Sequence, residues 1–300
     1  MSAATVSLPE PLAWAGSDRL APSRLRPVSS ERVPTVLSIA GSDSGGGAGI
    51  QADLKAFARC GVHGTTAITA ITAQNTVGVE DLESVSPRLI FALVRAVAAD
   101  IGVDAVKIGM LGTAETVDAV VGALVHVGGA PVVIDPVMVA ESGAILLDEA
   151  ARSALIERLL PRATVATPNI PEARALTGLG EDASQAELAR AVVTLGPEAA
   201  VVTGGHSEEV VDVFCIGDEV AEIRGPRYPD GAAHGSGCTH SASLAAMLAL
   251  GRNPYRAAER AREITSEAVR HGLRGIGAGP GPVDVFDLTG RHYGDTERGR

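Results

Sequence analysis

The sequence predicts an α/β fold in which helices cover both faces of a mostly parallel sheet. From Thr35 onward, short β-branched runs alternate with Ala- and Leu-rich segments of helical periodicity, as expected for repeated βαβ units. After residue 34, no linker-like break and no fixed-period repeat interrupts this alternation. We therefore expect one doubly wound domain whose ligand site lies at the carboxyl ends of the strands.

The first half of the chain is predicted to begin with a buried strand, which a glycine-rich turn joins to a helix that ends at Gly61. After the second strand, Pro87 occupies the first position of a helix whose apolar residues recur three and four apart. The predicted strands are 35–41, 65–73, 104–111 and 130–139, and the predicted helices are 50–60, 87–102, 114–127 and 148–161.

The second half continues the same alternation and adds a hairpin. Residues 209–225 form two β-like runs around Gly217 and Asp218, which predicts an antiparallel hairpin that turns at this pair. The other predicted elements are the strands 163–169 and 199–205 and the helices 184–196, 237–250 and 254–272.

Composition and charge disfavour several classes of protein. Hydrophobic residues make up 46% of the chain, and the longest apolar runs, such as 119–127, are far shorter than a membrane span. The net charge of −11 argues against general affinity for nucleic acids or anionic membranes. Cys60, Cys215 and Cys238 are far apart and form no C-x-x-C pair, which disfavours zinc ribbons and thioredoxin chemistry. A reducing cytoplasm is the expected compartment.

Polar and glycine-rich segments follow the predicted strand ends one after another. Since parallel strands end at one edge of a sheet, these segments are expected to converge on a single site. They are Gly41–Gly49, Gln74 and Asn75, Met110, Asp135, Asn169, Glu172 and Thr203–His206, with Gly235–Cys238 expected beside them.

The turn after the first strand, residues 41–53, has more than one possible use. It lacks the G-x-x-x-x-G-K-[ST] pattern of a P-loop, while residues 47–52 fit the weak dinucleotide pattern G-x-G-x-x-A. The acidic residue that such a site needs about 20 residues later is missing, because residues 70–75 contain none. The segment is also consistent with a tight packing turn, or with a cradle in which Asp53 accepts hydrogen bonds from a small polar ligand.

Asp135 and Glu172 are carboxylates that follow separate strands, and Asn169 precedes Glu172 by three residues. Oxygen ligands of this kind suit Mg²⁺, often through water. The same spacing fits a helix capping box, with Asn169 as N-cap and Glu172 at the third helical position. The residues alone leave both interpretations open, with capping slightly favoured.

Residues Gly235–Cys238 open an apolar helix, and backbone N–H groups at such a position favour a bound anion such as a phosphoryl group. The same field is expected to lower the pKa of the Cys238 thiol. A structural turn around a small buried cysteine is the simpler alternative. Hydrolase chemistry is disfavoured, because neither His234 nor His240 is placed by the sequence as a base for Cys238.

Several motifs occur here in a characteristic order, from the glycine-rich turn to "HGSGCTHSASLAA" at 234–246. Between them stand "ITAQNTVGV", "VKIGML", "VVIDPVM" and "TPNIPEARALTG". From about Thr35 to residues 279–283, the chain resembles the hydroxymethylpyrimidine/phosphomethylpyrimidine kinases of the ribokinase-like superfamily. This resemblance implies a single-domain three-layer sandwich over 34–290. Residues 1–33 mix Pro, Ser and Arg without sustained periodicity and are expected to be a flexible tail, and 291–300 is expected to be a C-terminal tail.

The resemblance also implies an activity. Such a kinase uses ATP and Mg²⁺ to phosphorylate 4-amino-5-hydroxymethyl-2-methylpyrimidine and then its monophosphate, for thiamine diphosphate synthesis. A pyridoxal kinase of the same fold is the alternative, and a catalytically silent binding protein is a further one. A homodimer is expected, with a small pyrimidine and ATP as ligands and neither nucleic acid nor membrane as a partner.

The resemblance assigns roles to individual residues of this chain. Cys238 is implied as the acceptor of the hydroxyl proton, in which case Cys238→Ala would impair the first phosphorylation more than the second. The implied sets are Gly41, Asp53, Gln74, Met110 and Val137 for the pyrimidine; Asp135 and Glu172 for the metal; Asn169, Thr203, Gly205 and His206 for ATP; and Gly235, Ser236, Gly237 and Cys238 for catalysis.

The chain departs from the family at two places that matter for phosphate binding. Thr203 stands where the family usually has a lysine, and only Lys55 and Lys107 are lysines in the whole chain. Residues 277–284 also lack the basic residue often found there, although Arg274 is near. Either an arginine compensates, or the second phosphorylation, with its more anionic acceptor, is weakened.

Overall fold

The computed structural model describes residues 32–139, 143, 145–205, 210–228, 232–288 and 290. Within these residues nine strands form one sheet, in the order β3-β2-β1-β4-β5-β6-β7-β8-β9. The strands are β1 (Thr35–Asp43), β2 (His63–Gln74), β3 (Val79–Ser84), β4 (Ala105–Ile108), β5 (Val132–Ile134), β6 (Val165–Ala166), β7 (Ala199–Val202), β8 (Val211–Ile216) and β9 (Glu219–Arg224).

Six neighbouring strands pair in parallel, in the order β2-β1-β4-β5-β6-β7. β3 at one edge of the sheet, and β8 and β9 at the other, pair antiparallel. The carboxyl ends of the parallel strands therefore lie along one edge of the sheet, where the sequence predicts the ligand site. The register between β1 and β2 shifts between Ala40 and Ser42, so Gly41 lies at the irregularity from which the chain enters the glycine-rich turn.

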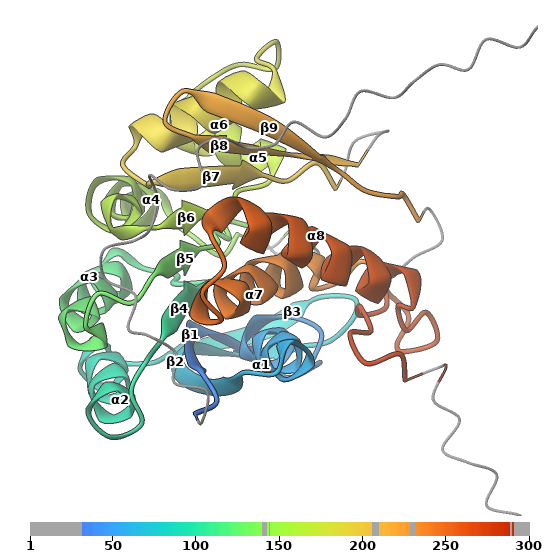
Figure 1. The fold of residues 1–300 in the computed structure, drawn as a ribbon. Coiled ribbons are helices and arrows are strands. Elements are labelled where there is room, and N and C mark those ends of the chain that lie inside the picture. Colours follow the sequence, from blue (N-terminus) through green and yellow to red (C-terminus); the bar gives the residue numbers. More distant parts are fainter. Residues whose placement is uncertain are drawn as a thin grey trace, which may run out of the picture.

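Helices form a layer on each side of the sheet (Figure 1). One layer contains α1, α7 and α8, and the other contains α2 to α6. The helices are α1 (Gly49–Cys60), α2 (Pro87–Asp100), α3 (Ala114–Ala123), α4 (Glu149–Ala154), α5 (Ile170–Thr177), α6 (Gln185–Thr194), α7 (Ser236–Ala249) and α8 (Pro254–Arg270). Short 3₁₀ or π-helical turns extend α3 at Leu124–Val127 and α4 at Leu155–Leu159 and Leu160–Arg162.

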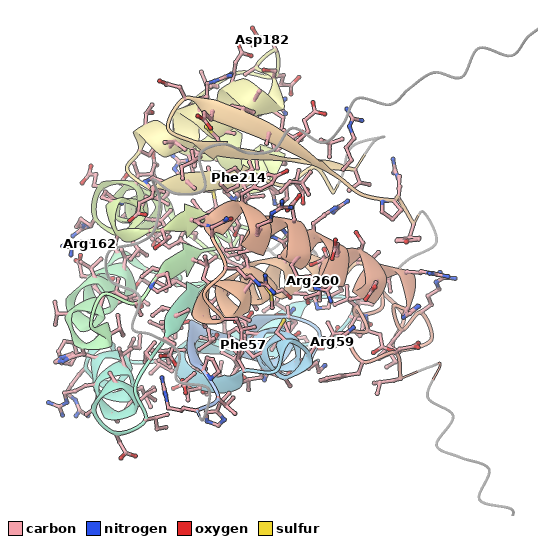
Figure 2. All side chains as sticks on the ribbon, viewed as in Figure 1. Phe57, Arg59, Arg162, Asp182, Phe214 and Arg260 are labelled. Carbon is pink, nitrogen blue, oxygen red and sulfur yellow. The ribbon has the colours of Figure 1, made fainter. Side chains whose placement is uncertain are left out.

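Two apolar cores result, because successive residues of a strand point to opposite faces. On β1, Val36 packs with α1, α7 and α8, while Leu37 packs with the opposite layer. Phe57 of α1 and Phe214 of β8 belong to the α7–α8 side, and Figure 2 shows how far apart they lie along the sheet. The predicted three-layer α/β architecture is confirmed.

Most predicted elements are present, with changed boundaries. The hairpin turns between β8 and β9 at Gly217 and Asp218, as predicted. The strands predicted at 130–139 and 163–169 are much shorter, because the chain leaves the sheet at Asp135 and Thr167. The sequence did not predict β3, and it indicated only the start of α5.

The predicted tails lie almost entirely outside the described residues, which begin at 32 and end at 290. Among the described helices, none combines the length and the apolar character that crossing a bilayer would require.

Candidate active site

The glycine-rich turn between β1 and α1 is organised by Asp43, a residue that the sequence did not single out. Its buried carboxylate accepts hydrogen bonds from the backbone N–H groups of Gly45, Gly47 and Ala48, at 2.8–2.9 Å. His234 lies 3.5 Å from the same carboxylate. Burial alone would raise the pKa of Asp43, but the hydrogen bonds from His234 and the three amides bring it below its ordinary value.

This turn lies directly against the loop that opens α7. Gly235 has φ of +81°, and a Cβ atom there would overlap the carbonyl oxygen of Gly47. The backbone of Gly49 also hydrogen-bonds Cys238. The structure therefore brings the predicted ligand cradle and the predicted anion site together at one place.

Gly41, Met110 and Gln74, three of the residues assigned to the pyrimidine, lie in the glycine-rich turn or beside it. A Cβ at Gly41 would meet the terminal methyl group of Met110, so these two residues are immediate neighbours. The backbone N–H of Gln74 donates to Ser44 Oγ at 2.8 Å, which fastens the end of β2 to the glycine-rich turn. Val137 lies two residues beyond Asp135, and its N–H donates to the Asp135 carbonyl at 2.8 Å.

Asp53 requires a correction. It was expected to accept hydrogen bonds from a ligand, but its side chain is 0% exposed. Its carboxylate is 2.9 Å from Lys107 Nζ, and Ser38 Oγ donates to it at 2.6 Å. Burial raises the pKa of Asp53, against the opposing effect of Lys107. In this arrangement Asp53 is paired with Lys107 and has no exposed surface to offer a ligand.

Lys107 is a site residue that the sequence did not reveal. It lies on β4 and is fully buried, with Nζ 3.9 Å from Asp135 Oδ2 in addition to its contact with Asp53. Burial would lower the pKa of Lys107, but the neighbouring Asp53, together with Cys238 and Asp135, raises it above its ordinary value. Lys107 thus places a positive charge under the carboxyl ends of the central strands.

The capping interpretation of Asn169 and Glu172 is confirmed. Asn169 Oδ1 accepts from the N–H of Glu172 at 2.8 Å, and Glu172 Oε2 accepts from the N–H of Asn169 at 2.9 Å. Glu172 also accepts a backbone hydrogen bond from Met138, so one carboxylate joins the start of α5 to the segment after β5.

Besides capping α5, the carboxyl group of Glu172 has an unusual pKa. Burial, together with the charge of Asp135, raises the pKa of Glu172 to about 8. Asp135 is also buried, and Ser241 Oγ donates to its Oδ2 at 2.9 Å. Two buried carboxylates that repel each other suit a hard cation, which often takes one or two carboxylates and completes its shell with water and phosphate. Among the described residues, no group of three or more acidic, His or Cys side chains is arranged for a metal ion.

The pKa of Cys238 differs from the expectation. Cys238 keeps part of its surface exposed, yet burial of the thiol raises its pKa to about 12. Asp135 and Asp53 add to this rise, so that burial and the two carboxylates together outweigh the lowering by Lys107 and by the Gly49 hydrogen bond. The predicted lowering of the pKa is therefore wrong, because two buried carboxylates and the loss of water act against the field of the helix start.

The structure brings together Asn169 and Thr203, two of the four residues that were predicted to bind ATP. Thr203 follows β7 and pairs with Asn169, and its N–H donates to the carbonyl of Pro168 at 2.9 Å. Gly205 is exposed, and a Cβ there would meet no atom within 4 Å. His206 lies outside the described residues.

Comparisons with known proteins point to one family. A family model described as "Phosphomethylpyrimidine kinase" matches residues 43–284. The hydroxymethylpyrimidine/phosphomethylpyrimidine kinase of Haemophilus influenzae is 45% identical, covering 84% of this chain and 96% of the relative. The protein of that name from Rhizobium meliloti is 48% identical, covering 83% and 96%. An ADP complex of Bacillus subtilis pyridoxal kinase superposes with a TM-score of 0.79 at 35% identity, covering 86% of this chain and 99% of that one.

Proposed function

Because the chain belongs to the phosphomethylpyrimidine kinase family and is a phosphotransferase, we propose that it phosphorylates 4-amino-5-hydroxymethyl-2-methylpyrimidine with ATP. The monophosphate is then phosphorylated again to the diphosphate, as a step of thiamine diphosphate synthesis. The relatives at 45% and 48% identity carry both reactions in their names.

One observation carries this proposal most directly, namely the contact between the glycine-rich turn and the start of α7. The backbone of Gly49 hydrogen-bonds Cys238, and Gly235 lies against Gly47. A hydroxyl group held by the glycine-rich turn would therefore lie next to a phosphoryl group held at the start of α7. Phosphoryl transfer depends mainly on such positioning and on stabilising charge at the transferred oxygens.

We assign the pyrimidine to the space beside Gly41, Gln74, Met110 and Val137. The Gln74 side chain offers both an amide donor and an amide acceptor for an aminopyrimidine ring, and the thioether of Met110 offers an apolar surface. Asp53 acts behind this site by holding Lys107.

The backbone N–H groups of residues 235–238 are proposed to stabilise the transferred phosphoryl group, as a helix start does for anions. A thiol with a pKa of about 12 is protonated at neutral pH, so Cys238 lines this site as a neutral group. In a loose transition state the attacking hydroxyl gives up its proton late, so a strong base at this position contributes little.

Asp135 and Glu172 fit a magnesium ion, because burial and neighbouring carboxylates raise the pKa of both groups, and a bound cation would stabilise their ionised forms. Such an ion, when bound with ATP, neutralises charge on the phosphate oxygens. Asn169, Thr203 and Gly205 are assigned to the nucleotide, and His206 is assigned to it from its place in the sequence alone.

The decisive experiment incubates the purified protein with ATP and Mg²⁺ and separates the products by chromatography. We expect the pyrimidine alcohol to be converted first to the monophosphate and then to the diphosphate. A separate reaction contains pyridoxal, the acceptor of the structural relative from Bacillus subtilis. Faster ADP release with pyridoxal than with the pyrimidine would contradict the substrate assignment, and no ADP release with either would contradict the activity.

The place of action is proposed as the cytoplasm. All three cysteines are free thiols in the described structure, which agrees with a reducing compartment.

A further inference from the structure

A second buried charged cluster lies behind the predicted nucleotide turn and has no part in the reaction described so far. At its centre is Asp212 on β8, whose side chain is 1% exposed. Asp212 Oδ1 accepts a hydrogen bond from the backbone N–H of Gly204 at 3.0 Å. Gly204 stands between Thr203 and Gly205, the two described residues of the turn that are assigned to ATP.

The other carboxylate oxygen of Asp212 faces two further elements. Arg262 Nε of α8 and His240 Nε2 of α7 each lie 3.8 Å from Asp212 Oδ2, within ion-pair distance but beyond hydrogen-bond distance. Burial lowers the pKa of His240, so at neutral pH the ring is uncharged and the charge of Asp212 is balanced by Arg262. Arg262 also donates to the Val210 carbonyl at 3.3 Å, beside the start of β8.

The arrangement links the two halves of the proposed ATP site. His240 lies two residues after Cys238 on the helix whose start forms the anion site. Gly204 is held close to β8 as well, because a Cβ there would overlap the carbonyl oxygen of Val211. Asp212 therefore holds the turn at residues 203–205 against β8, next to His240 of α7.

Stabilisation of the fold alone does not explain this cluster well. A buried ion pair gains little net stability, because removing both charges from water costs about as much as their attraction returns. Here the geometry is loose on the Arg262 and His240 side, while the short contact is the one to the Gly204 amide. That contact is directed at the nucleotide turn.

We propose that Asp212 is a positioning residue for the nucleotide, which holds the turn at residues 203–205 in register with the anion site at the start of α7. This inference rests on the proposed use of ATP. It does not depend on which acceptor is phosphorylated.

The test compares Asp212→Ala with Asp212→Asn, whose amide oxygen still offers an acceptor to Gly204 N–H. The matched control is Asp104→Ala. Asp104 likewise accepts a hydrogen bond from a backbone N–H, that of Thr35 at 2.7 Å, and pairs with Arg32. It directly precedes β4, so it lies at the amino ends of the parallel strands, away from the proposed site.

For each protein we would measure the dissociation constant of ADP, the KM for ATP, the KM for the pyrimidine and the melting temperature. Loss of the Gly204 hydrogen bond should weaken ADP and raise the KM for ATP about tenfold in Asp212→Ala. The KM for the pyrimidine should stay within about twofold. Asp212→Asn should recover most of the nucleotide affinity, and Asp104→Ala should lose stability without loss of nucleotide affinity.

The inference is overturned if Asp212→Ala binds ADP as well as the unmodified protein, or if Asp104→Ala weakens ADP equally. Should Asp212→Ala fail to fold, Asp212→Ser is measured instead, since the shorter side chain keeps a polar atom but not the reach to Gly204. If the unmodified protein binds ADP but does not phosphorylate the pyrimidine, only the substrate assignment fails. If it binds no ADP at all, both proposals fail.

Discussion

Cys238 shows how the surroundings of a single side chain can reverse an expectation drawn from its position. The start of a helix favours a thiolate, but Asp135, Asp53 and burial raise the pKa of this thiol to about 12. The sequence predicts that Asp135 and Cys238 lie near each other, but it does not indicate that two buried carboxylates raise the pKa of the thiol. The electrostatics of the site is therefore a tertiary property.

We accordingly expect Cys238→Ala to slow both phosphorylation steps by a similar factor, below about 10². A neutral thiol that lines the anion site matters equally for an alcohol and for a phosphate acceptor. The measurement is single-turnover kinetics with the pyrimidine alcohol and, separately, with its monophosphate. A loss of about 10²–10⁴ confined to the first step would restore Cys238 as a proton acceptor, because the phosphate acceptor is already ionised.

Gly235 and Gly237 lie close together in the chain, but we expect their substitution by alanine to have different effects on stability. Gly235 has positive φ and no space for a Cβ, whereas a Cβ at Gly237 would meet no atom within 4 Å. We expect Gly235→Ala to lower the free energy of unfolding by about 3 kcal/mol, through backbone strain and displacement of the glycine-rich turn.

Gly237→Ala serves as the companion variant. It should leave stability unchanged or raise it by up to about 1 kcal/mol, while the added methyl group beside the helix amides lowers activity. Urea unfolding and the kinase assay measure the two effects. Equal stability of both variants would contradict the contact between Gly235 and Gly47.

At the scale of elements, the long apolar strands and helices could be predicted from periodicity, but short or edge elements could not. β3 contains three acidic residues and is exposed along most of its length, so it is a strand only because it pairs with β2. Lys107 lies inside an otherwise apolar run on β4, and only the packing of α1 and α7 explains its burial.

The start of α5 allows a prediction about pH. The folded-state pKa of Glu172 is about 8, above its ordinary value of 4.5. The folded protein thus binds this proton more tightly, and the stabilisation is complete below pH 4.5 and is lost as the pH rises to about 8. With EDTA present to remove metal ions, the contribution of Glu172 to the free energy of unfolding should fall by at most about 4–5 kcal/mol over this pH range.

Glu172→Gln keeps a capping residue at the third helical position and removes the titration. Urea unfolding at pH 5, 6.5 and 8 should show a smaller loss of stability with rising pH in this variant than in the unmodified protein. Adding Mg²⁺ at pH 8 should stabilise the unmodified protein more than the variant. Parallel pH profiles would show that Glu172 is ionised throughout this range.

At the scale of the whole molecule, the sheet leaves one edge strand with apolar exposure. Leu82 on β3 is 41% exposed, and Ile71 and Val77 nearby are 54% and 62% exposed. Unpaired edges with exposed apolar residues favour association. We therefore test the expected homodimer at this edge.

Light scattering should accordingly give twice the chain mass of 30.5 kDa. Leu82→Glu should shift the protein toward the monomer, whereas Leu179→Glu, a comparably exposed leucine after α5, should not. A single-chain mass for the unmodified protein at micromolar concentration would contradict the dimer.

The fold class and the edge of the sheet that carries the site follow from the order of elements along the chain. Gly41, Gln74, Met110, Asp135 and Cys238 were placed near one another on this basis alone. The burial of Asp53 against Lys107 and the contacts of Asp43 and Asp212 depend on which side chains face each other, and a single sequence does not contain that information.

The strand order has a consequence for synthesis of the protein. β1 and α1 are among the first elements made, yet the helix layer on this side of the sheet is completed only by α7 and α8 (Figure 1). While the ribosome is still translating the middle of the chain, α1 alone covers that apolar face of the sheet. Nascent chains therefore carry a partly uncovered sheet surface until about residue 261 has emerged, which is the interval in which a chaperone would have to shield them.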